Sequence, residues 1–381
     1  MSAPLLDGVT VLDLSQFLSG PFAALRLGDL GARVIKIERP DGGDLCRRLY
    51  LTDTEIGGDS TLFHAINRGK LGFAADFKNP ADVAAVKSLI ARSDIMIQNF
   101  RPGVIERLGL DYASVKAINP AIVYASITGY GDAGPWTSLP GQDLLAQARS
   151  GLMWLNGDHD QGPVPFGLAI ADLLAGGAIV QGVLAALVRR GKTGEGAHIE
   201  TSLIEALIDF QFEVLTTYMN DGGRMPARSQ FRNAHAYLAA PYGVYETADG
   251  WLAVAMTPLD KLASVIELPA IAGLPAKAAF ERRDEIKRAI ANHIRSQPTA
   301  HWLARMQPAD IWCAEVLDWP ALFKSEAFKV LDMLQRVSGP DGRIVDTTRS
   351  PIRIDGARHV CRSAAPRIGE HTEMLRAEFG L

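Results

Sequence analysis

The chain has 381 residues and a formal net charge of −4, and 48% of its residues are hydrophobic while 22% are charged. This composition is typical of a folded globular protein, and the charge provides no basic field for nucleic acid. Three widely separated cysteines form neither a metal-binding spacing nor a disulfide framework. We therefore expect a cytoplasmic protein without a metal site or a signal peptide.

The first half of the chain alternates short apolar runs with segments of helical composition. A turn at Ser19-Gly20-Pro21 separates the first run from the next helix, and Pro21 suits a helix start. This alternation predicts the α/β class, with a doubly wound, mostly parallel sheet and ligands beyond the carboxyl ends of its strands. We expect strands over 9–14, 33–38, 95–100, 122–127 and 197–201, and helices over 22–30, 80–93 and 203–218.

The pattern changes at about residue 222. The turn Ala248-Asp249-Gly250 between two apolar runs predicts a β-hairpin, and helical segments follow over 282–295 and 301–306. A second hairpin turn, over 339–342, precedes a short strand over 343–346. We predict a large Rossmann-like domain over 1–221, a smaller α+β domain over 222–320, and a C-terminal segment over 321–381 that returns to the large domain.

Residues 167–188 are almost wholly apolar and about long enough to cross a bilayer. The segment contains Asp172 and Gln181, however, and it is rich in glycine and alanine. An isolated carboxylate is unfavourable in lipid, whereas small residues let a helix pack closely in a protein core. We therefore predict a buried helix and no membrane association.

The loop after the first predicted strand does not match a nucleotide-binding motif. Glu38 ends the second strand, where a ribose-binding acid would lie, but residues 15–21 contain one glycine and the pyrophosphate fingerprint needs three. NAD and ATP are therefore disfavoured. Cations recur near the strand ends and could approach one anionic ligand, namely Lys36, Arg39, Lys70, Lys78, Arg101 and Arg107.

A set of short blocks, in order along nearly the whole chain, resembles one known family. The blocks are Val11-Leu12-Asp13, Ser19-Gly20-Pro21, Asp29-Leu30-Gly31-Ala32, Val34 to Pro40, Asn67-Arg68-Gly69-Lys70, Asn99 to Gly103, Thr128-Gly129-Tyr130-Gly131, Gln147-Ala148 with Ser150-Gly151, Gly191 to Gly196, and Gly369-Glu370-His371-Thr372. As a set they are similar to class III CoA-transferases, the CaiB/BaiF family that includes formyl-CoA transferases.

The resemblance implies an interlocked, ring-like homodimer in which each subunit has a doubly wound domain and a small domain. It also implies acyl-CoA and small carboxylic acids as substrates, without a tightly bound cofactor. The CoA-contacting positions of the family fall on Gln16, Phe17, Leu18, Ser19, Arg39, Ala75, Lys78, Asn99, Phe100 and Arg107. The position of Gln16 is often histidine in the family.

The nucleophilic aspartate of the family falls on Asp172. A carboxylate nucleophile preserves thioester energy, because it forms an anhydride with the acyl group and then a thioester with CoA itself. The expected place of Asp172 in the first turn of a helix favours its negative charge, and backbone N–H groups nearby could hold an oxyanion. From its context alone, an acid near a helix start more often serves stability, and it is the resemblance that favours catalysis by Asp172.

Three alternatives remain open from the residues. Asp143 orients groups at the active site or is an ordinary helix cap. A 2-methylacyl-CoA racemase of the same fold has histidine before that acid, whereas this chain has Gln142, which cannot act as a base. A non-catalytic CoA-binding protein would not need Asp172. Residues 233–241 lack the glycine run of formyl- and oxalyl-transferring members, which disfavours oxalate or formate as the acid.

Overall fold

The computed structural model describes residues 4–381. Its contacts divide the chain into two compact units. The first unit comprises the residues up to Ala146 together with Ala169–Phe210 and Leu331–Leu381, and the second comprises Gln147–Leu168 and Gln211–Val330. The second unit thus includes residues outside the predicted small domain of 222–320. One reason is that Arg228 donates to the backbone carbonyls of Asn156, Gln161 and Gly162, which ties 147–168 to this unit.

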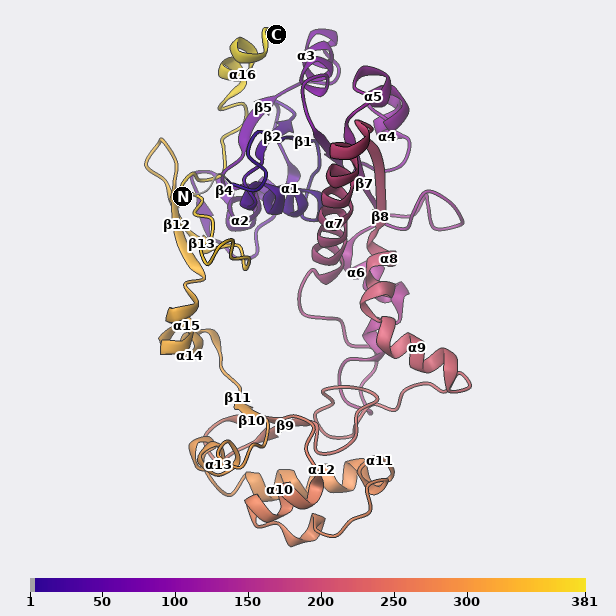
Figure 1. Ribbon diagram of the computed structural model, residues 1–381, viewed down its shortest axis with the longest axis vertical. Coiled ribbons are helices and arrows are strands. Elements are labelled where there is room, and N and C mark those ends of the chain that lie inside the picture. The colour runs from indigo at the N-terminus through magenta and orange to yellow at the C-terminus, as the bar shows by residue number, and fades with distance from the viewer. Residues whose placement is uncertain (1–3) are drawn as a thin grey trace. The chain divides into compact units, whose positions relative to one another are not determined.

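A six-stranded sheet forms the centre of the first unit (Figure 1). Its strand order is β5-β2-β1-β6-β7-β8, and every neighbouring pair is parallel. This confirms the predicted α/β class with a mostly parallel sheet. Of these strands, only β5 was not predicted, because four residues containing a glycine give a weak strand signal. The strands are β1 (Thr10–Asp13), β2 (Arg33–Glu38), β5 (Leu71–Ala74), β6 (Ile95–Gln98), β7 (Val123–Thr128) and β8 (Ala197–Ser202).

Helices cover both faces of this sheet, because side chains alternate between the two faces along each buried strand. Leu12, Ile35 and Met96 point into a core shared with α3 (Pro80–Ile90), α5 (Tyr112–Ile118) and α16 (Thr372–Phe379). The other face carries α1 (Ser19–Asp29) and α7 (Ile170–Thr193), which contact each other and the strands beneath them. This second layer positions the candidate site, since both helices begin near the carboxyl ends of the strands.

The apolar helix α7 is buried along one face only. It is long and apolar enough to cross a membrane by length and composition alone. Ala175, Ile179 and Val183 pack inward, and the helix contacts α1, β7, β8 and α8, as a core helix does. Val188 is 65% exposed on another face. The prediction of a buried helix therefore holds for one face of α7 only, because the sheet and α1 cover only part of its surface.

The helix predicted over 203–218 is also interrupted. Helix α8 (Leu203–Phe210) ends before Gln211, whose backbone angles of φ −93° and ψ 11° break the helix, and α9 (Phe212–Asn220) begins directly after it. Helical composition continues across the break, so the sequence does not reveal it.

The remaining elements of the first unit are η1 (Leu45–Arg48), β3 (Glu55–Ile56), β4 (Asp59–Ser60), α2 (Thr61–Asn67), α4 (Val104–Arg107), β12 (Leu334–Ser338) and β13 (Ile344–Thr348), and α6 (Asp143–Ser150) runs from the first unit into the second.

The second unit contains a three-stranded antiparallel sheet, β11-β10-β9. Strands β9 (Gly243–Glu246) and β10 (Trp251–Val254) form the predicted hairpin. Tyr245, Leu252 and Trp302 lie in its core. Its other elements are η2 (Leu152–Trp154), α10 (Leu259–Ile266), η3 (Pro269–Ile271), α11 (Ala278–Glu281), α12 (Arg283–Ile294), α13 (Thr299–Met306), β11 (Cys313–Glu315), α14 (Trp319–Lys324) and α15 (Glu326–Leu331), the last of which ends in the first unit.

Candidate active site

The loops that follow β1 and β6 meet at the carboxyl edge of the sheet. Strand β1 lies between β2 and β6, so this is the switch point of the sheet: β2 and β5 lie on one side of β1, and β6, β7 and β8 lie on the other. The side chain of Asn99 clamps the backbone of Gln16: its Oδ1 accepts from the Gln16 N–H at 2.8 Å and its Nδ2 donates to the Gln16 carbonyl at 2.8 Å. Nδ2 also donates to the Ser19 hydroxyl at 3.3 Å. Such crevices bind ligands in doubly wound folds.

The loop over 16–19 has an unusual backbone. Phe17 has φ 61°, a left-handed conformation that non-glycine residues rarely adopt, and its side chain is 46% exposed. Asp44 holds this conformation, because its Oδ1 accepts from the Phe17 N–H at 3.2 Å. Leu18 packs against the small apolar cluster around Phe63. The loop is thus fixed by neighbouring groups before any ligand binds.

A buried ion network supports the loop from below. Lys36 pairs with Asp44 at 2.9 Å and donates to the Ser15 carbonyl at 2.9 Å, while Lys70 pairs with Asp13 at 2.7 Å. All four charged side chains are almost wholly buried. Burial alone would raise the pKa of the Asp13 carboxyl, but Lys36 and Lys70 hold it below its ordinary value. The suggestion that Lys36 and Lys70 approach an anionic ligand was therefore wrong, since both pair with buried acids.

Glu38 belongs to a second buried cluster. Its carboxylate accepts two hydrogen bonds from Arg47, at 2.9 and 2.7 Å, and one from the Asp44 N–H at 2.9 Å. Arg47 in turn pairs with Asp59 at 2.8 Å. A ribose-binding acid needs an accessible carboxylate, so this arrangement agrees with the sequence motif in disfavouring a dinucleotide.

The other residues that the resemblance assigned to CoA surround the same edge with different exposure. Arg39, Lys78 and Arg107 are exposed, and Arg39 Nε donates to the Gly43 carbonyl at 3.0 Å. Ala75 differs, because its methyl group lies in the hydrophobic core and its N–H donates to the Glu38 carbonyl at 2.8 Å. Phe100 is partly buried, and its N–H donates to the Gln98 side chain at 2.9 Å.

Asp172 lies in the first turn of α7, as predicted. Its half-buried carboxylate receives hydrogen bonds from the hydroxyl and the backbone N–H of Ser19, at the start of α1. Burial and then the nearby charge of Asp143 raise the pKa of Asp172 to about 7, against the opposing effect of Ser19. The expected stabilisation of the charged form by the helix start is therefore outweighed, and the carboxyl titrates near neutral pH.

Asp143 is bonded to the residue before Asp172. Its Oδ1 accepts from the Ala171 N–H at 2.7 Å, so it satisfies a backbone donor at the start of α7. Two glycines bring Asp143 there, since a Cβ on Gly141 would lie 2.4 Å from the Gly129 Cα. The neighbouring Gln142 is exposed. Thus the 128–131 and 141–143 segments, which are remote in sequence from 169–172, converge on one helix start.

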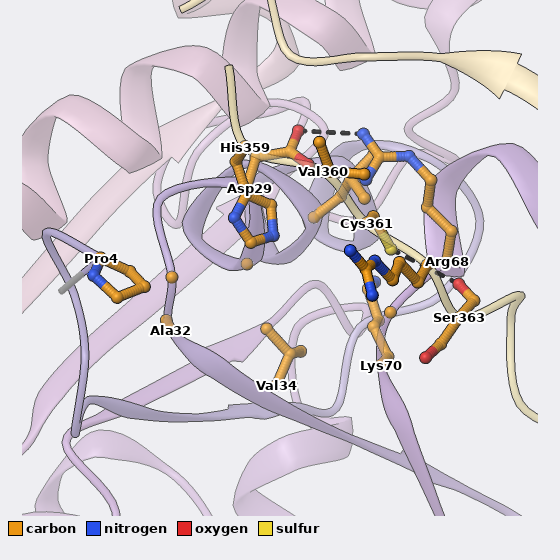
Figure 2. A pocket seen from close by; sticks show the side chains of 15 residues that line it. Pro4, Asp29, Ala32, Val34, Arg68, Lys70, His359, Val360, Cys361 and Ser363 are labelled. Atoms are coloured by element: carbon orange, nitrogen blue, oxygen red, sulfur yellow. Dashed lines mark hydrogen bonds and ion pairs between the residues drawn. The ribbon is translucent and has the colours of Figure 1, made fainter. Parts of the chain in front are cut away.

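The cavity shown in Figure 2 lies elsewhere in the first unit. It has a volume of about 340 Å³ and borders the amino-terminal ends of β2 and β5, near Val34 and Lys70. Arg68 forms two hydrogen bonds with Asp29 across it, at 2.7 and 3.1 Å, and Cys361 lies beside them. Arg68 is thus paired with Asp29, and Lys70 is paired with Asp13, while the residues assigned to CoA lie at the opposite ends of the strands.

The histidines form no metal site among residues 4–381. His198 stacks on Tyr112 with ring centroids 4.6 Å apart and bonds the Ser126 hydroxyl at 3.0 Å. His64 bonds the Ile56 carbonyl at 2.8 Å, and His371 accepts from the Gly72 N–H at 3.1 Å. His235 accepts from the Tyr237 N–H in the second unit. These contacts agree with the structural roles that are the default for isolated histidines.

Comparison with known proteins identifies the family. The model of CoA-transferase family III matches residues 6–372. The chain belongs to this family. It is 32% identical to a succinate–glutarate CoA-transferase of Agrobacterium fabrum, over 99% of this chain and 96% of the relative, and 33% identical to an acetyl-CoA:oxalate CoA-transferase of Acetobacter aceti, over 98% and 95%. A CaiB/BaiF family protein from Brucella suis has the same fold, with a TM-score of 0.85, 31% identity and coverage of 99% and 100%.

These matches confirm the family resemblance and establish the chain as a class III CoA-transferase. Its relatives are named for the transfer of CoA between small acids, so acyl-CoA thioesters act as substrates in this family. The family resemblance indicated Asp172, and sequence patterns indicated the loops at the sheet edge. They did not indicate Asp44 or the clamp by Asn99, because both depend on contacts between segments more than 25 residues apart.

Proposed function

We propose that Asp172 is the nucleophile through which this enzyme transfers CoA from an acyl-CoA to a free carboxylic acid. The observation that carries the proposal is a carboxylate at the meeting of two helix starts, with a pKa near 7. A carboxylate of raised pKa is more basic, and hence more nucleophilic, than an ordinary one, yet it is largely ionised at slightly alkaline pH.

The reaction then runs in four balanced steps. The Asp172 carboxylate attacks the donor thioester carbonyl, forming an aspartyl–acyl anhydride and releasing CoA thiolate. The thiolate attacks the aspartyl carbonyl, forming aspartyl-CoA and releasing the donor carboxylate. The acceptor carboxylate attacks aspartyl-CoA, giving a second anhydride and CoA thiolate. The thiolate finally attacks the acceptor acyl carbonyl, which yields the new acyl-CoA and free Asp172.

The residues at the sheet edge bind the CoA moiety in this proposal. Arg39, Lys78 and Arg107 are exposed cations in the segments that follow β2, β5 and β6, and the phosphates of CoA are their natural partners. Ala75 can contribute only through its backbone carbonyl, because its side chain and N–H are already engaged. Asp143 is a positioning residue that holds the start of α7, in agreement with its bond to Ala171.

The acids exchanged are, we propose, short dicarboxylic acids. The succinate–glutarate pair appears in the names of relatives from Agrobacterium fabrum and mouse, which match at 32% and 30% identity.

The enzyme acts as a homodimer in this proposal. Exposed apolar side chains on the first unit support association with a second copy, for example Val188 on α7 at 65% exposure.

One experiment tests the nucleophile. The protein is incubated with succinyl-CoA and hydroxylamine, which converts an aspartyl anhydride or thioester to a hydroxamate, and peptides are analysed by mass. We expect modification at Asp172 in the wild type, and none in Asp172→Asn together with loss of CoA transfer to glutarate. Normal turnover by Asp172→Asn would refute the proposal. Unmodified wild-type protein that still binds CoA would indicate a binding protein, and racemisation of a 2-methylacyl-CoA without an acceptor acid would indicate a racemase.

A further inference from the structure

The hydroxyl of Ser19 lies between an amide and a carboxylate. Asn99 Nδ2 is 3.3 Å from Ser19 Oγ, and Nδ2 is only a donor, so the serine oxygen accepts this hydrogen bond. The side chain of Asn99 has its orientation fixed, because its Oδ1 accepts from the Gln16 N–H. An ionised Asp172 only accepts, and a hydroxyl has a single proton. The contacts therefore direct the Ser19 O–H proton to Asp172.

We propose that Ser19 is a catalytic residue whose hydroxyl and N–H together hold an oxygen of Asp172 throughout the reaction, and that Asn99 positions this hydroxyl. The inference rests on the proposed role of Asp172 as nucleophile. In the second and third steps above, the attacked carbon is the aspartyl carbonyl carbon itself. Negative charge then develops on the Asp172 oxygen, where two donors that are already in place stabilise it.

The surroundings of Ser19 keep these donors fixed. The Ser19 side chain is buried, and a Cβ on Gly20 would lie 2.2 Å from the Ser15 Cβ, so this turn is closely packed. On the other side, the Ser19 carbonyl lies against Gly176 of α7. A donor held by packing does not have to reorient when charge appears, which is the condition for effective electrostatic catalysis.

The same geometry changes the expected role of two residues that the resemblance assigned to CoA. The Asn99 amide already bonds the Gln16 backbone and Ser19, and the Ser19 hydroxyl already bonds Asn99 and Asp172. In this inference their side chains act on the nucleophile and on its supporting loop. At Ser19 and Asn99, only the backbone then contacts CoA.

The test compares pH profiles of kcat/KM for CoA transfer in Ser19→Ala and the wild type. Loss of a hydrogen bond to the charged carboxylate should move the acidic limb upward by about one pH unit, and loss of one oxyanion donor should lower kcat by about 10- to 100-fold while the N–H donor remains. Ser19→Cys, which keeps the shape but donates weakly, should shift the limb in the same direction and serves if Ser19→Ala does not fold.

A double-mutant cycle tests the role of Asn99. Asn99→Ala should move the acidic limb to higher pH by less than Ser19→Ala does, and the double variant should shift it by less than the sum of the two single shifts, because the hydroxyl that Asn99 orients is already absent in Ser19→Ala. Additive shifts would overturn the positioning role.

Hydroxylamine trapping at Asp172 in the same variants separates the two proposals. Suppose that folded Ser19→Ala is still modified by hydroxylamine at Asp172, while its kcat and the acidic limb of its kcat/KM profile equal those of the wild type. That result would overturn the role of Ser19 and leave Asp172 as the nucleophile. Absence of trapping in the wild type would overturn both.

Discussion

The backbone carbonyl of Ser19 lies directly against Gly176, so that a Cβ at position 176 would be 2.6 Å from the carbonyl oxygen. This contact lets α7 approach the start of α1 without an intervening side chain. Because Gly176 is one helical turn after Asp172, the same approach brings the Asp172 carboxylate to the donors of Ser19. A glycine in the helix interior thus determines the geometry of the candidate site.

Gly176→Ala should therefore reduce stability and activity. The added methyl group must displace a backbone carbonyl, so we expect a loss of about 1–3 kcal/mol in the free energy of unfolding and at least a tenfold fall in kcat. Gly177→Ala is the matched control: a Cβ there has no heavy-atom neighbour within 4 Å among the described residues. It should gain up to about 1 kcal/mol from helix propensity. Equal stabilities in urea unfolding would show that the helices are not closely packed.

Asp172→Asn should stabilise the protein at alkaline pH. The pKa of Asp172 is about 7 in the folded protein, against 3.8 for an unperturbed aspartate carboxyl. The folded state therefore keeps its proton to higher pH, and the resulting stabilisation is present below pH 4 and lost as the pH rises through 7. About 3 pH units separate the two values, so Asp172→Asn should gain up to ~4 kcal/mol over the wild type at pH 8.

The two proteins should converge in stability as the pH falls below about 4. Urea unfolding at pH 4, 6 and 8 measures the difference. A constant difference at all three pH values would contradict the raised pKa, and a less stable Asn variant at pH 8 would indicate that Asp172 serves stability.

The sequence predicted the parallel sheet well, because buried parallel strands are continuous apolar runs. The predicted strand over 33–38 matches β2 at both ends, and the predicted strand over 197–201 ends one residue before β8. The break at Gln211 was missed, since it depends on backbone angles and not on a helix-breaking residue. The surface of α7 was misjudged for a related reason: apolar composition does not show how much of a helix its neighbours cover.

The candidate site was less predictable than the fold. Asp172 was located through the family motif, whereas its environment is built by Ser19, Asn99 and Asp143 from distant segments. The positive charge of Lys36 suggested a role in ligand binding, but the partners that bury it, Asp13 and Asp44, cannot be inferred from charge patterns. Contacts across long sequence separations were therefore the missing information.

Replacing Lys36 should damage the support beneath the 16–19 loop. Lys36→Met leaves Asp44 without its cationic partner in a buried site, and the loss of one member of a buried ion pair typically reduces stability by about 3–5 kcal/mol. Lys78→Met, at an exposed position, should change the free energy of unfolding by at most about 0.5 kcal/mol. Denaturant unfolding compares the two variants. Similar stabilities would contradict the pairing of Lys36 with Asp44.

The same pair of variants separates loop support from phosphate binding. Lys78→Met should raise KM for the acyl-CoA with little change in kcat, because in the proposed complex this exposed cation contributes to CoA binding without touching the nucleophile. Lys36→Met, if it folds, should lower kcat as well, since the Ser15 carbonyl loses its donor and the loop that carries Ser19 is loosened. Unchanged kcat in folded Lys36→Met would show that the network supports the fold alone.

Asp143→Asn and Asp143→Ala distinguish the charge of Asp143 from its hydrogen bond. Both changes remove the negative charge that raises the pKa of Asp172, so the acidic limb of kcat/KM should move to lower pH in both variants. Asparagine keeps an oxygen that accepts from the Ala171 N–H, whereas alanine leaves this donor at the start of α7 unsatisfied. Asp143→Ala should therefore be less stable than Asp143→Asn by about 1 kcal/mol.

The pH profile also tests whether Asp143 transfers protons itself. A residue that acts as an acid or base in turnover would lose activity at every pH in both variants, and the limb would not simply move. A positioning residue should instead keep near-normal kcat in Asp143→Asn at a pH well above 7, where Asp172 is ionised in either protein. Loss of activity across the whole pH range in folded Asp143→Asn would assign proton transfer to Asp143, because that variant retains the bond to Ala171 and lacks only the titratable group.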